Sequence, residues 1–493
     1  MIRDSRQKLT LFCVGLALLF PACKEAGPEN TPSQEKQWEL SDKTLVNIIR
    51  EEHYTPEEFV ESLGSPSFTE VLESIEPNAL PWADALIKAK VLAHVPVLDR
   101  QFDKECNNGV LSKRCWEIQS YIFTYRTQTV DGRDVVLSAR VTFPNNTVGN
   151  ILHQVKTLSL HFHQGFFSSE WTPSESLMFM PLKALWDSAV IEPDLQKWGI
   201  THGIEADGGG SGLHMARQMA DCTVAALEVM RQHGVSLAPD GYTTNWGSSQ
   251  SAVPALIFAR WYEEEAPQWY KDALRLHSTF SGEGAIDMPA FIEHSYKHPE
   301  LIPPLLTIIV AYIKAFSPEQ LGGYSPNDFV PQWYIDTKYE VNGREITFYD
   351  AVSFFYTDIV DPIGQKMTSF DEVVAPDMLT PDGEVDMDCP KIRAWMACLK
   401  KHNKLEGWTP EHPVFLAHSQ EDGMIPYELA YNLYRTLSNE GQNTKVHMMN
   451  VSSLGDFPTG GLNTHFVISF MVQIHMACMR DPSDMLLIYN PVK

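Results

Sequence analysis

The chain has 493 residues, and its 63 acidic and 38 basic side chains give a formal net charge of −25. Hydrophobic residues make up 44% and charged residues 20%, the balance of an ordinary globular protein that can bury a large core. The strong negative charge argues against nucleic acid and disfavours anionic lipid headgroups, because both bind basic surfaces. These two partners are therefore not expected.

Residues 1–22 have the pattern of an export signal. A basic stretch precedes the apolar run 9–20, which is too short to span a bilayer. Cys23 then follows in a setting that resembles the lipobox of bacterial lipoproteins, in which this cysteine is acylated. We predict an exported protein, lipid-anchored in the bacterial cell envelope, with residues 23–37 as a flexible tether. Secretion without a lipid is the alternative.

Four cysteines form two local pairs, Cys106 with Cys115 and Cys389 with Cys398, each nine residues apart. Exported proteins meet an oxidising environment, so these pairs are candidate disulfides, although connectivity does not follow from sequence. Metal binding is the alternative, but the sequence has no Cys-x-x-Cys motif and no short Cys/His cluster. We expect no metal and no cofactor.

Residues 38–118 are predicted to be mainly helical, as an extension packed on the core. Strands and helices then alternate over 119–285, the pattern of an α/β domain. Between the strand near 274–279 and the strand at 413 lies a connection far longer than ordinary loops. We expect an insertion over 286–400 that acts as a lid, with 301–313 as a buried helix. Its aromatic residues either line an acyl pocket or form the lid's own core: Phe329, Trp333, Tyr334, Phe348, Tyr349, Phe354, Phe355 and Tyr356.

A serine lies where a strand gives way to a helix. β-prone residues lead into Gly247-x-Ser249-x-Ser251, and a helical run over 252–259 follows. In a nucleophile elbow the serine sits on a tight turn, so the residues two before and two after it must be small. Ser249 meets this demand, whereas the flanking residues of Ser248 are too large. Ser249 is therefore the predicted nucleophile.

An acid and a histidine follow in the order that such a serine needs. The segment 413–418 is predicted to be a buried strand, and Asp422 lies in the loop after it, before a helix over 427–437. A second strand over 445–451 leads through a glycine-rich loop to His465, at the start of a last helix. We predict that Asp422 orients the His465 imidazole, which acts as the base.

Other residues of the same types offer alternatives. Asp456 is a second candidate acid, but its setting is that of a turn rather than a strand end. His418 and His475 are candidate bases, but a strand end and an apolar helix favour roles in packing or core hydrogen bonds.

With these residues in place, the chain resembles the α/β-hydrolase superfamily, and within it secreted bacterial esterases and lipases of the secretory lipase group. The resemblance implies that Ser249, Asp422 and His465 form the catalytic triad. It also implies an oxyanion hole made by the backbone N–H of Gln250 and a second donor, Phe166 or Gln164, from the loop after the 158–163 strand. Two features depart from the group: Ser251 replaces a glycine, and Gln164 interrupts a His-Gly pair. The other matching segments are 129–132, 138–144, 190–194, 198–199 and 219–222.

The predicted fold is therefore an α/β-hydrolase with a mostly parallel central sheet, an N-terminal helical extension and a large, mainly helical lid. The predicted units are 1–22, 23–37, 38–118, 119–285, 286–400 and 401–493, the last being the second part of the core. The predicted activity is hydrolysis of a small-molecule or lipid acyl ester through an acyl-enzyme. Two alternatives are a non-catalytic surface-binding lipoprotein and a peptidase, in which lid acids would bind a free amino terminus: Glu340, Asp350, Asp358 and Asp361.

Overall fold

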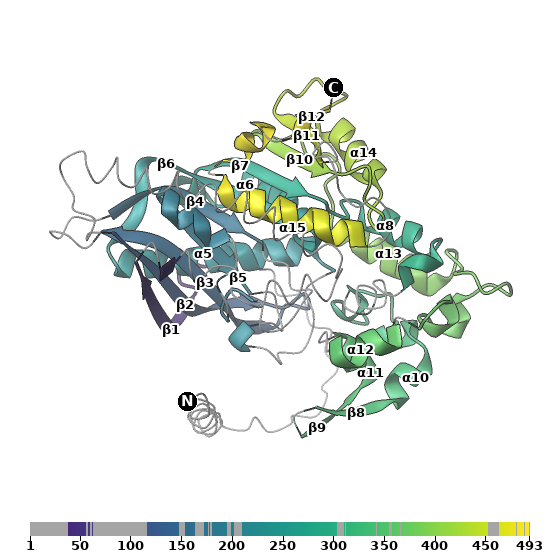
Figure 1. Cartoon of the computed structure of the whole chain (residues 1–493). Coiled ribbons are helices and arrows are strands. Elements are labelled where there is room, and N and C mark those ends of the chain that lie inside the picture. The colour runs from purple at the N-terminus through teal and green to yellow at the C-terminus, as the bar shows by residue number, and fades with distance from the viewer. Residues whose placement is uncertain are drawn as a thin grey trace. The chain divides into compact units, whose positions relative to one another are not determined.

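The computed structural model describes residues 38–55, 58–59, 62, 116–146, 153–162, 172–175, 177, 180–194, 199–201, 210–302, 310, 312–341, 343–353, 357–364, 366–451, 463–479, 481–487 and 489–492 (Figure 1). The predicted signal peptide, the tether and several predicted residues lie outside these ranges: Cys23, Cys106, Cys115, Gln164, Phe166, Phe354, Phe355, Tyr356 and Asp456.

A single ten-stranded sheet organises the chain (Figure 1). In spatial order it contains β1 (Leu45–Tyr54), β2 (Trp116–Gln128), β3 (Asp134–Asn146), β5 (Ser188–Pro193), β4 (His153–His161), β6 (Val235–Ser248), β7 (Leu276–Gly282), β10 (Val414–His418), β11 (Val446–Asn450) and β12 (Asn490–Pro491). The strands from β5 through β4, β6, β7 and β10 to β11 are parallel. The strands at both edges are antiparallel. This confirms the predicted mostly parallel α/β sheet.

Helices cover both faces of the parallel strands. On β7, Ser281 Oγ donates to the carbonyl of Ala252, the first residue of α6 (Ala252–Glu264). A Cβ added to the next residue, Gly282, would instead lie 3.0 Å from Val472 of α15 (Asn463–Cys478). Because neighbouring residues of a strand point to opposite faces, α6 and α15 lie on opposite sides of the sheet.

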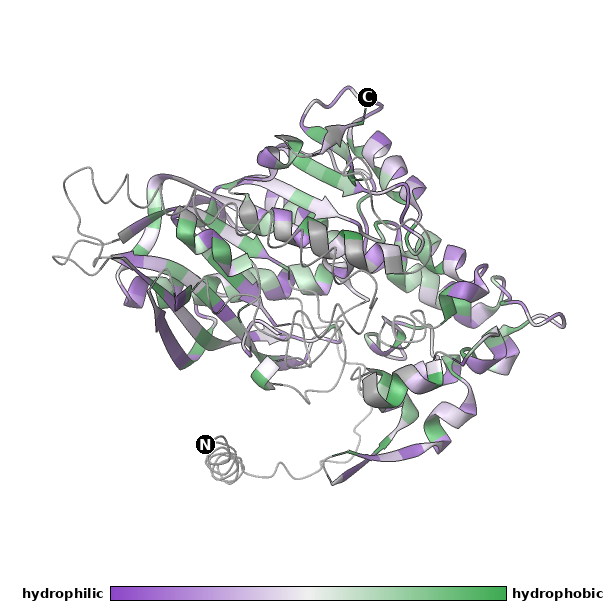
Figure 2. Cartoon of the chain, viewed as in Figure 1, coloured by the Kyte–Doolittle hydropathy of each residue, from purple (hydrophilic) through white to green (hydrophobic). Residues whose placement is uncertain are grey.

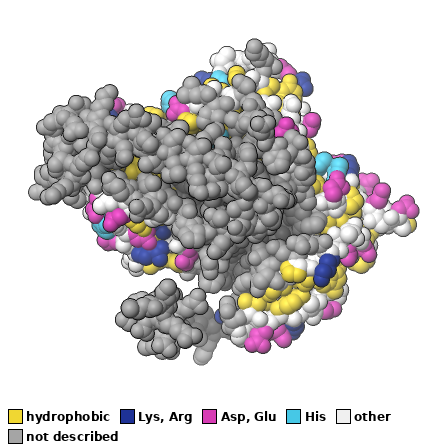
Figure 3. Space-filling model, in the orientation of Figure 1, with side chains coloured by type: hydrophobic (Ala, Val, Ile, Leu, Met, Phe, Trp, Pro, Cys, Tyr) yellow, Lys and Arg dark blue, Asp and Glu magenta, His cyan; other side chains and the backbone are white. Residues whose placement is uncertain are grey.

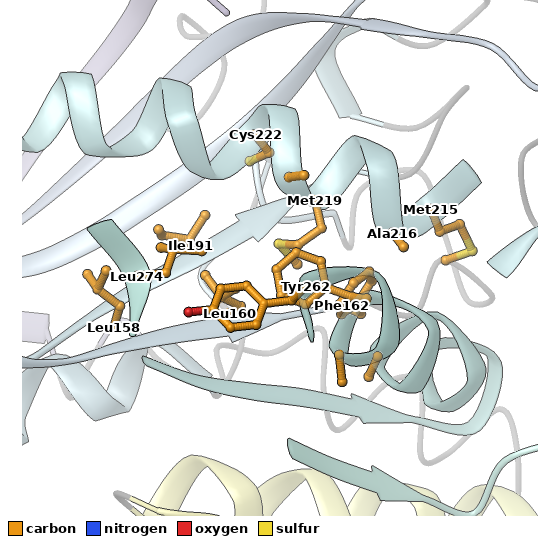
Figure 4. Close-up of a cluster of buried hydrophobic side chains, with 14 of the residues drawn as sticks. Leu158, Leu160, Phe162, Ile191, Met215, Ala216, Met219, Cys222, Tyr262 and Leu274 are labelled. Carbon is orange, nitrogen blue, oxygen red and sulfur yellow. The ribbon is translucent and has the colours of Figure 1, made fainter. Parts of the chain in front are cut away.

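The largest core lies on the α6 side, where α5 (Gly212–Gln232) also packs. Leu158, Leu160 and Phe162 of the β4 segment belong to the same buried cluster as Met215, Met219 and Cys222 of α5 (Figure 4). Their i, i+2 spacing on the strand matches an apolar stripe on the helix, which is why the two elements pack. Green, hydrophobic residues are interspersed with white and purple ones along the strands and helices around the sheet (Figure 2).

The first strand, β1, differs from the mainly helical structure predicted for 38–118, of which 63–115 lies outside the described residues. Residues 45–54 pair antiparallel with β2, and the sequence Val46-Asn47-Ile48-Ile49 is rich in β-branched residues that favour a strand. Its second half, Arg50-Glu51-Glu52-His53, is charged, as suits an edge strand that must not pair with another chain. The pairing partner is more than sixty residues away in sequence, so local periodicity did not reveal it.

The segment between β7 and β10, called the insertion below, has its own apolar core. Phe329, Tyr334 and Phe348 are fully buried in it, so these aromatic residues belong to that core and not to an open pocket. The same core includes Met424 and Ile425, which lie in the loop after β10. The described part of the insertion contains these α-helices and one β-hairpin: α8 (Met288–Ser295), α10 (Gln332–Asp336), β8 (Lys338–Val341), β9 (Arg344–Thr347), α11 (Phe348–Ser353), α12 (Thr357–Gly364) and α13 (Pro390–His402).

The predicted disulfide between Cys389 and Cys398 is wrong, because both cysteines are free and buried. Cys389 caps the amino terminus of α13, and Cys398 lies inside that helix. Nine residues of helix rise by about 13 Å, whereas a disulfide needs Cα atoms within about 7 Å.

Figure 3 shows more acidic than basic side chains on the described part of this face, as the net charge requires. None of the helices in the described ranges combines the length and the apolar character that crossing a membrane demands.

Candidate active site

Ser249 occupies the turn between β6 and α6. Its φ of 52° lies in the left-handed region, which non-glycine residues seldom adopt and which marks a strained turn. The chain crosses itself closely here, because a Cβ added to Gly247 would lie 2.2 Å from the Ser251 carbonyl oxygen and 2.8 Å from Cβ of Ala255. Only glycine fits at position 247, as predicted for an elbow.

Ser251 fits where a glycine is usual because its side chain folds back on the strand end. Its hydroxyl donates to the Ser248 carbonyl at 2.8 Å and accepts from the Ser248 N–H at 3.0 Å. The serine therefore satisfies two backbone groups at a turn where the ladder of β6 has ended. It adds hydrogen bonds to the elbow without adding bulk.

Asp422 is held by its own loop at the end of β10. Its Oδ1 accepts the backbone N–H groups of Met424 and Ile425, each at 2.9 Å. Its Oδ2 lies 2.8 Å from Nδ1 of His465, and the carboxylate is fully buried. Burial alone would raise the pKa of Asp422, but the charge and hydrogen bond of His465, with smaller contributions from His418 and the Ile425 N–H, lower it to about 2.

His465 lies in the first turn of α15, and its ring is buried. Nε2 is 2.9 Å from Ser249 Oγ. The carboxylate of Asp422 can only accept a hydrogen bond, which assigns the ring proton to Nδ1 and leaves Nε2 as the acceptor for the serine hydroxyl. The structure thus brings together all three predicted residues, in the geometry that nucleophilic catalysis by a serine requires.

The alternative histidines have other partners. His418 Nε2 donates to the Ile425 carbonyl at 2.9 Å and lies 3.5 Å from Asp422 Oδ2. Burial lowers the pKa of His418 and favours a neutral ring. His475 Nδ1 is 2.7 Å from the hydroxyl of Tyr489. Both make core hydrogen bonds, which fits the structural roles predicted for them.

Glu283 is a buried acid beside the site that the sequence analysis missed. It directly follows β7, its φ is 49°, and its N–H donates to the Ala417 carbonyl at 2.8 Å. Its side chain is fully buried, and one ligand atom each of Glu283, Asp422 and His465 lies within 4.8 Å of the others. A signal was present in the sequence: an acid that directly follows a strand, between two glycines.

This group of two carboxyls and one imidazole has the composition of a metal site. However, Nδ1 of His465 is bonded to Asp422 and Nε2 faces Ser249, so both ring nitrogens have protein partners. The geometry therefore fits a hydrogen-bonded cluster better than a bound ion.

Of the predicted oxyanion hole, Gln250 follows the nucleophile at the turn where its N–H is needed, and Phe166 lies outside the described residues. The strand that leads to the Phe166 loop ends in a buried pair, His161 Nδ1 with Glu192 Oε1 at 2.9 Å. The N–H of Phe162 donates to the Trp246 carbonyl at 3.0 Å, which ties this strand end to the elbow. The oxyanion hole itself stays a prediction.

Comparison with solved structures agrees with this architecture. The rice cell wall degrading esterase LipA from Xanthomonas oryzae, in a ligand-bound form, is similar with a TM-score of 0.54 and 14% identity, over 77% of this chain and 94% of that one. A provisionally named hydrolase of Legionella pneumophila gives the same TM-score, identity and coverage. No protein-family model and no curated protein sequence matches the chain. The chain has the α/β-hydrolase fold.

Proposed function

We propose that the protein is a serine hydrolase that cleaves carboxylic esters. The observation that carries the proposal is the continuous chain of hydrogen bonds from Ser249 Oγ to His465 Nε2 at 2.9 Å and from His465 Nδ1 to Asp422 Oδ2 at 2.8 Å. Ser249 sits on a strained elbow, and the acid is locked by two backbone N–H groups. A surface-binding protein would have no need of these features together.

The reaction follows from the assignment of the ring proton. His465 Nε2 takes the proton of Ser249 as Oγ attacks the ester carbonyl, and Asp422 stabilises the imidazolium that forms. Collapse of the tetrahedral intermediate expels the alcohol, which receives that proton from His465. Water, activated by the same ring, then releases the acid from the acyl-enzyme. The backbone N–H of Gln250 would hold the oxyanion, a contribution worth roughly 3–4 kcal/mol per donor in comparable enzymes.

The acidic residues of the insertion favour an ester over a peptide as the substrate, because they do not form a site for a free amino terminus. A peptidase that selects a free amino terminus needs an unpaired carboxylate, but Asp350 pairs with Lys314 at 2.9 Å and accepts from Thr347. Glu340 is exposed on the β8–β9 hairpin. The fold is shared with an esterase that degrades rice cell walls, which also supports an ester substrate. The proposed substrate class is an ester of a lipid or of an acylated glycan.

The decisive test uses the soluble part of the chain, residues 24–493, with a fluorophosphonate probe and a panel of p-nitrophenyl esters and aminoacyl anilides. Wild type should be labelled and should hydrolyse the esters, and Ser249→Ala should lose both properties while remaining folded. The neighbouring Ser248→Ala is the matched control, because Ser248 Oγ is buried 3.2 Å from Ser469 Oγ. Labelling that survives in Ser249→Ala and disappears in Ser248→Ala would move the nucleophile. Hydrolysis of anilides alone would favour the peptidase.

His465→Ala gives a second, independent check of the proposal. The variant should lower kcat by several orders of magnitude, because no other described histidine lies within hydrogen-bonding distance of Ser249 Oγ. Activity close to wild type would mean that another base serves the nucleophile.

A further inference from the structure

Four neighbouring strands end at one edge of the sheet, and each contributes a polar residue there. Ser249 follows β6, Glu283 follows β7, Asp422 lies in the loop after β10, and His465 follows the β11 loop. Because β7 lies between β6 and β10, Glu283 is placed between the nucleophile strand and the acid strand. Its position is thus fixed by the same strands that fix the triad.

The surroundings of Glu283 do not suit a carboxylate. The side chain is fully buried, and in the described part of the chain no lysine or arginine forms an ion pair with it. Neither carboxyl oxygen has a hydrogen bond of ordinary geometry from a donor within the described ranges. The backbone N–H of Ser419 lies near the carboxyl and lowers the pKa of Glu283, but by less than burial and Asp422 raise it. The ionisable groups that face it are Asp422 beside it, His418 with Nε2 at 3.9 Å, His465 and the buried hydroxyl of Tyr489.

An ionised Glu283 would therefore place a second negative charge next to Asp422, where both side chains are fully buried. Burial, and then the charge of Asp422, raise the pKa of Glu283 well above its usual range. Two carboxyls this close avoid repulsion by sharing a single proton, one remaining acid and the other ionised. Asp422 is the ionised member, because His465 and two backbone N–H groups stabilise its charge.

We propose that Glu283 is a protonated carboxylic acid that donates a hydrogen bond to Asp422 and so positions the acid of the triad. The inference deepens the proposed ester hydrolysis and rests on it. Glu283 is a positioning residue, since it acts on Ser249 only through Asp422 and His465. Its neutrality keeps the charge that faces the imidazole at a single negative unit, and its hydrogen bond restrains the Asp422 carboxylate.

Two substitutions of similar size separate the hydrogen bond from the packing. Glu283→Gln keeps a donor and is neutral, whereas Glu283→Met fills the space without a donor. We expect Glu283→Gln to keep kcat within about threefold of wild type and Glu283→Met to lower kcat by about 10- to 100-fold, the usual worth of a hydrogen bond to a charged group. KM should change little in either variant, because the buried Glu283 side chain does not contact substrate.

The pH profile tests the protonation state directly. The acidic limb of kcat/KM reports the ionisation of the catalytic base in the free enzyme. Replacing a neutral acid by a neutral amide leaves this limb in place, so Glu283→Gln should match wild type. If Glu283 were ionised in wild type, Glu283→Gln would remove a negative charge near the imidazole and shift the acidic limb to lower pH by about one unit. Such a shift would overturn the proposal.

Infrared difference spectroscopy gives a readout that does not depend on activity. Wild type minus Glu283→Gln should contain the carbonyl stretch of a protonated carboxylic acid at neutral pH, with the small shift in D₂O that such a group shows. Carboxylate bands in its place would overturn the proposal, as would loss of activity on treatment of wild type with a chelator, which would assign the cluster to a metal ion. The infrared result does not depend on whether Ser249 is the nucleophile. Fluorophosphonate labelling therefore tests the proposed function separately.

Discussion

Replacing Asp422 by Asn is expected to disable the site through the tautomer of His465. The Asn carbonyl oxygen can accept the N–H groups of Met424 and Ile425 as Oδ1 of Asp422 does, which turns the amide NH₂ toward His465 Nδ1. Nδ1 must then accept a hydrogen bond, and the ring proton moves to Nε2. A protonated Nε2 cannot take the proton of Ser249, and the loss in comparable triads is about 10⁴-fold in kcat.

The same substitution should change the pH dependence of stability. The pKa of Asp422 is lowered from 3.8 to about 2 in the folded state. At about 1.4 kcal/mol per pH unit, this corresponds to roughly 2–3 kcal/mol of the free energy of unfolding near neutral pH. A lowered pKa stabilises above the unfolded value of 3.8 and the contribution is lost as the pH falls through about 2. Wild type should therefore exceed Asp422→Asn in stability at neutral pH, and the difference should vanish in acid.

The assays are kcat on a p-nitrophenyl ester and thermal unfolding across a pH series. Glu421→Gln is the control, because it removes a neighbouring carboxylate of the same loop without touching the hydrogen bonds to His465. Asp422→Asn with activity near wild type would refute the assignment of the acid. A stability difference that persists unchanged in acid would refute the ionisation argument.

Two further predictions concern the elbow and the amino terminus. Gly247→Ala should destabilise the protein by about 1–3 kcal/mol and slow fluorophosphonate labelling, since the added Cβ would meet the Ser251 carbonyl oxygen at 2.2 Å. Gly383→Ala is the control, because its φ of 81° also strains an alanine but the added Cβ meets no atom within 4 Å and lies outside the elbow. It should leave labelling unchanged, and equal slowing of labelling in the two variants would contradict the steric argument. Cys23→Ser should release the protein from membranes without altering its hydrolytic activity, and cell fractionation measures this release. Mass spectrometry of the mature amino terminus is the second measurement. An unmodified residue 23 in wild type would exclude a lipid anchor.

Much of the core was predictable because each element leaves a local pattern. The helix predicted over 427–437 is α14 (Tyr427–Leu437), and the strand predicted over 413–418 is β10 within one residue. The elbow was predictable from steric demands that act within five residues of Ser249. The nucleophile, the acid and the base could be proposed because each follows a recognisable strand or starts a recognisable helix.

What the sequence did not reveal depends on distant contacts. β1 is a strand because it pairs with β2, more than sixty residues away, and the β-branched residues of its first half did not by themselves reveal that pairing. Glu283 stands beside Asp422 because β7 and β10 are neighbours across a long insertion, which no local pattern records. The predicted Cys389–Cys398 disulfide was wrong for the opposite reason, because residues nine apart are close in sequence but far apart along a helix.

The direct pairing of β7 with β10 has a consequence for how this protein can change. Thr279 lies opposite Val414 and Gly282 opposite Ala417, so the two strands hold each other whatever the length of chain between them. Lengthening a connection costs little, about 0.6 kcal/mol for each doubling, so evolution or an engineer can exchange the insertion while the reacting groups stay in place. Any such exchange must satisfy one structural constraint. Met424 and Ile425, whose N–H groups hold Asp422, bury their side chains in the insertion's core, and any replacement must offer them apolar partners.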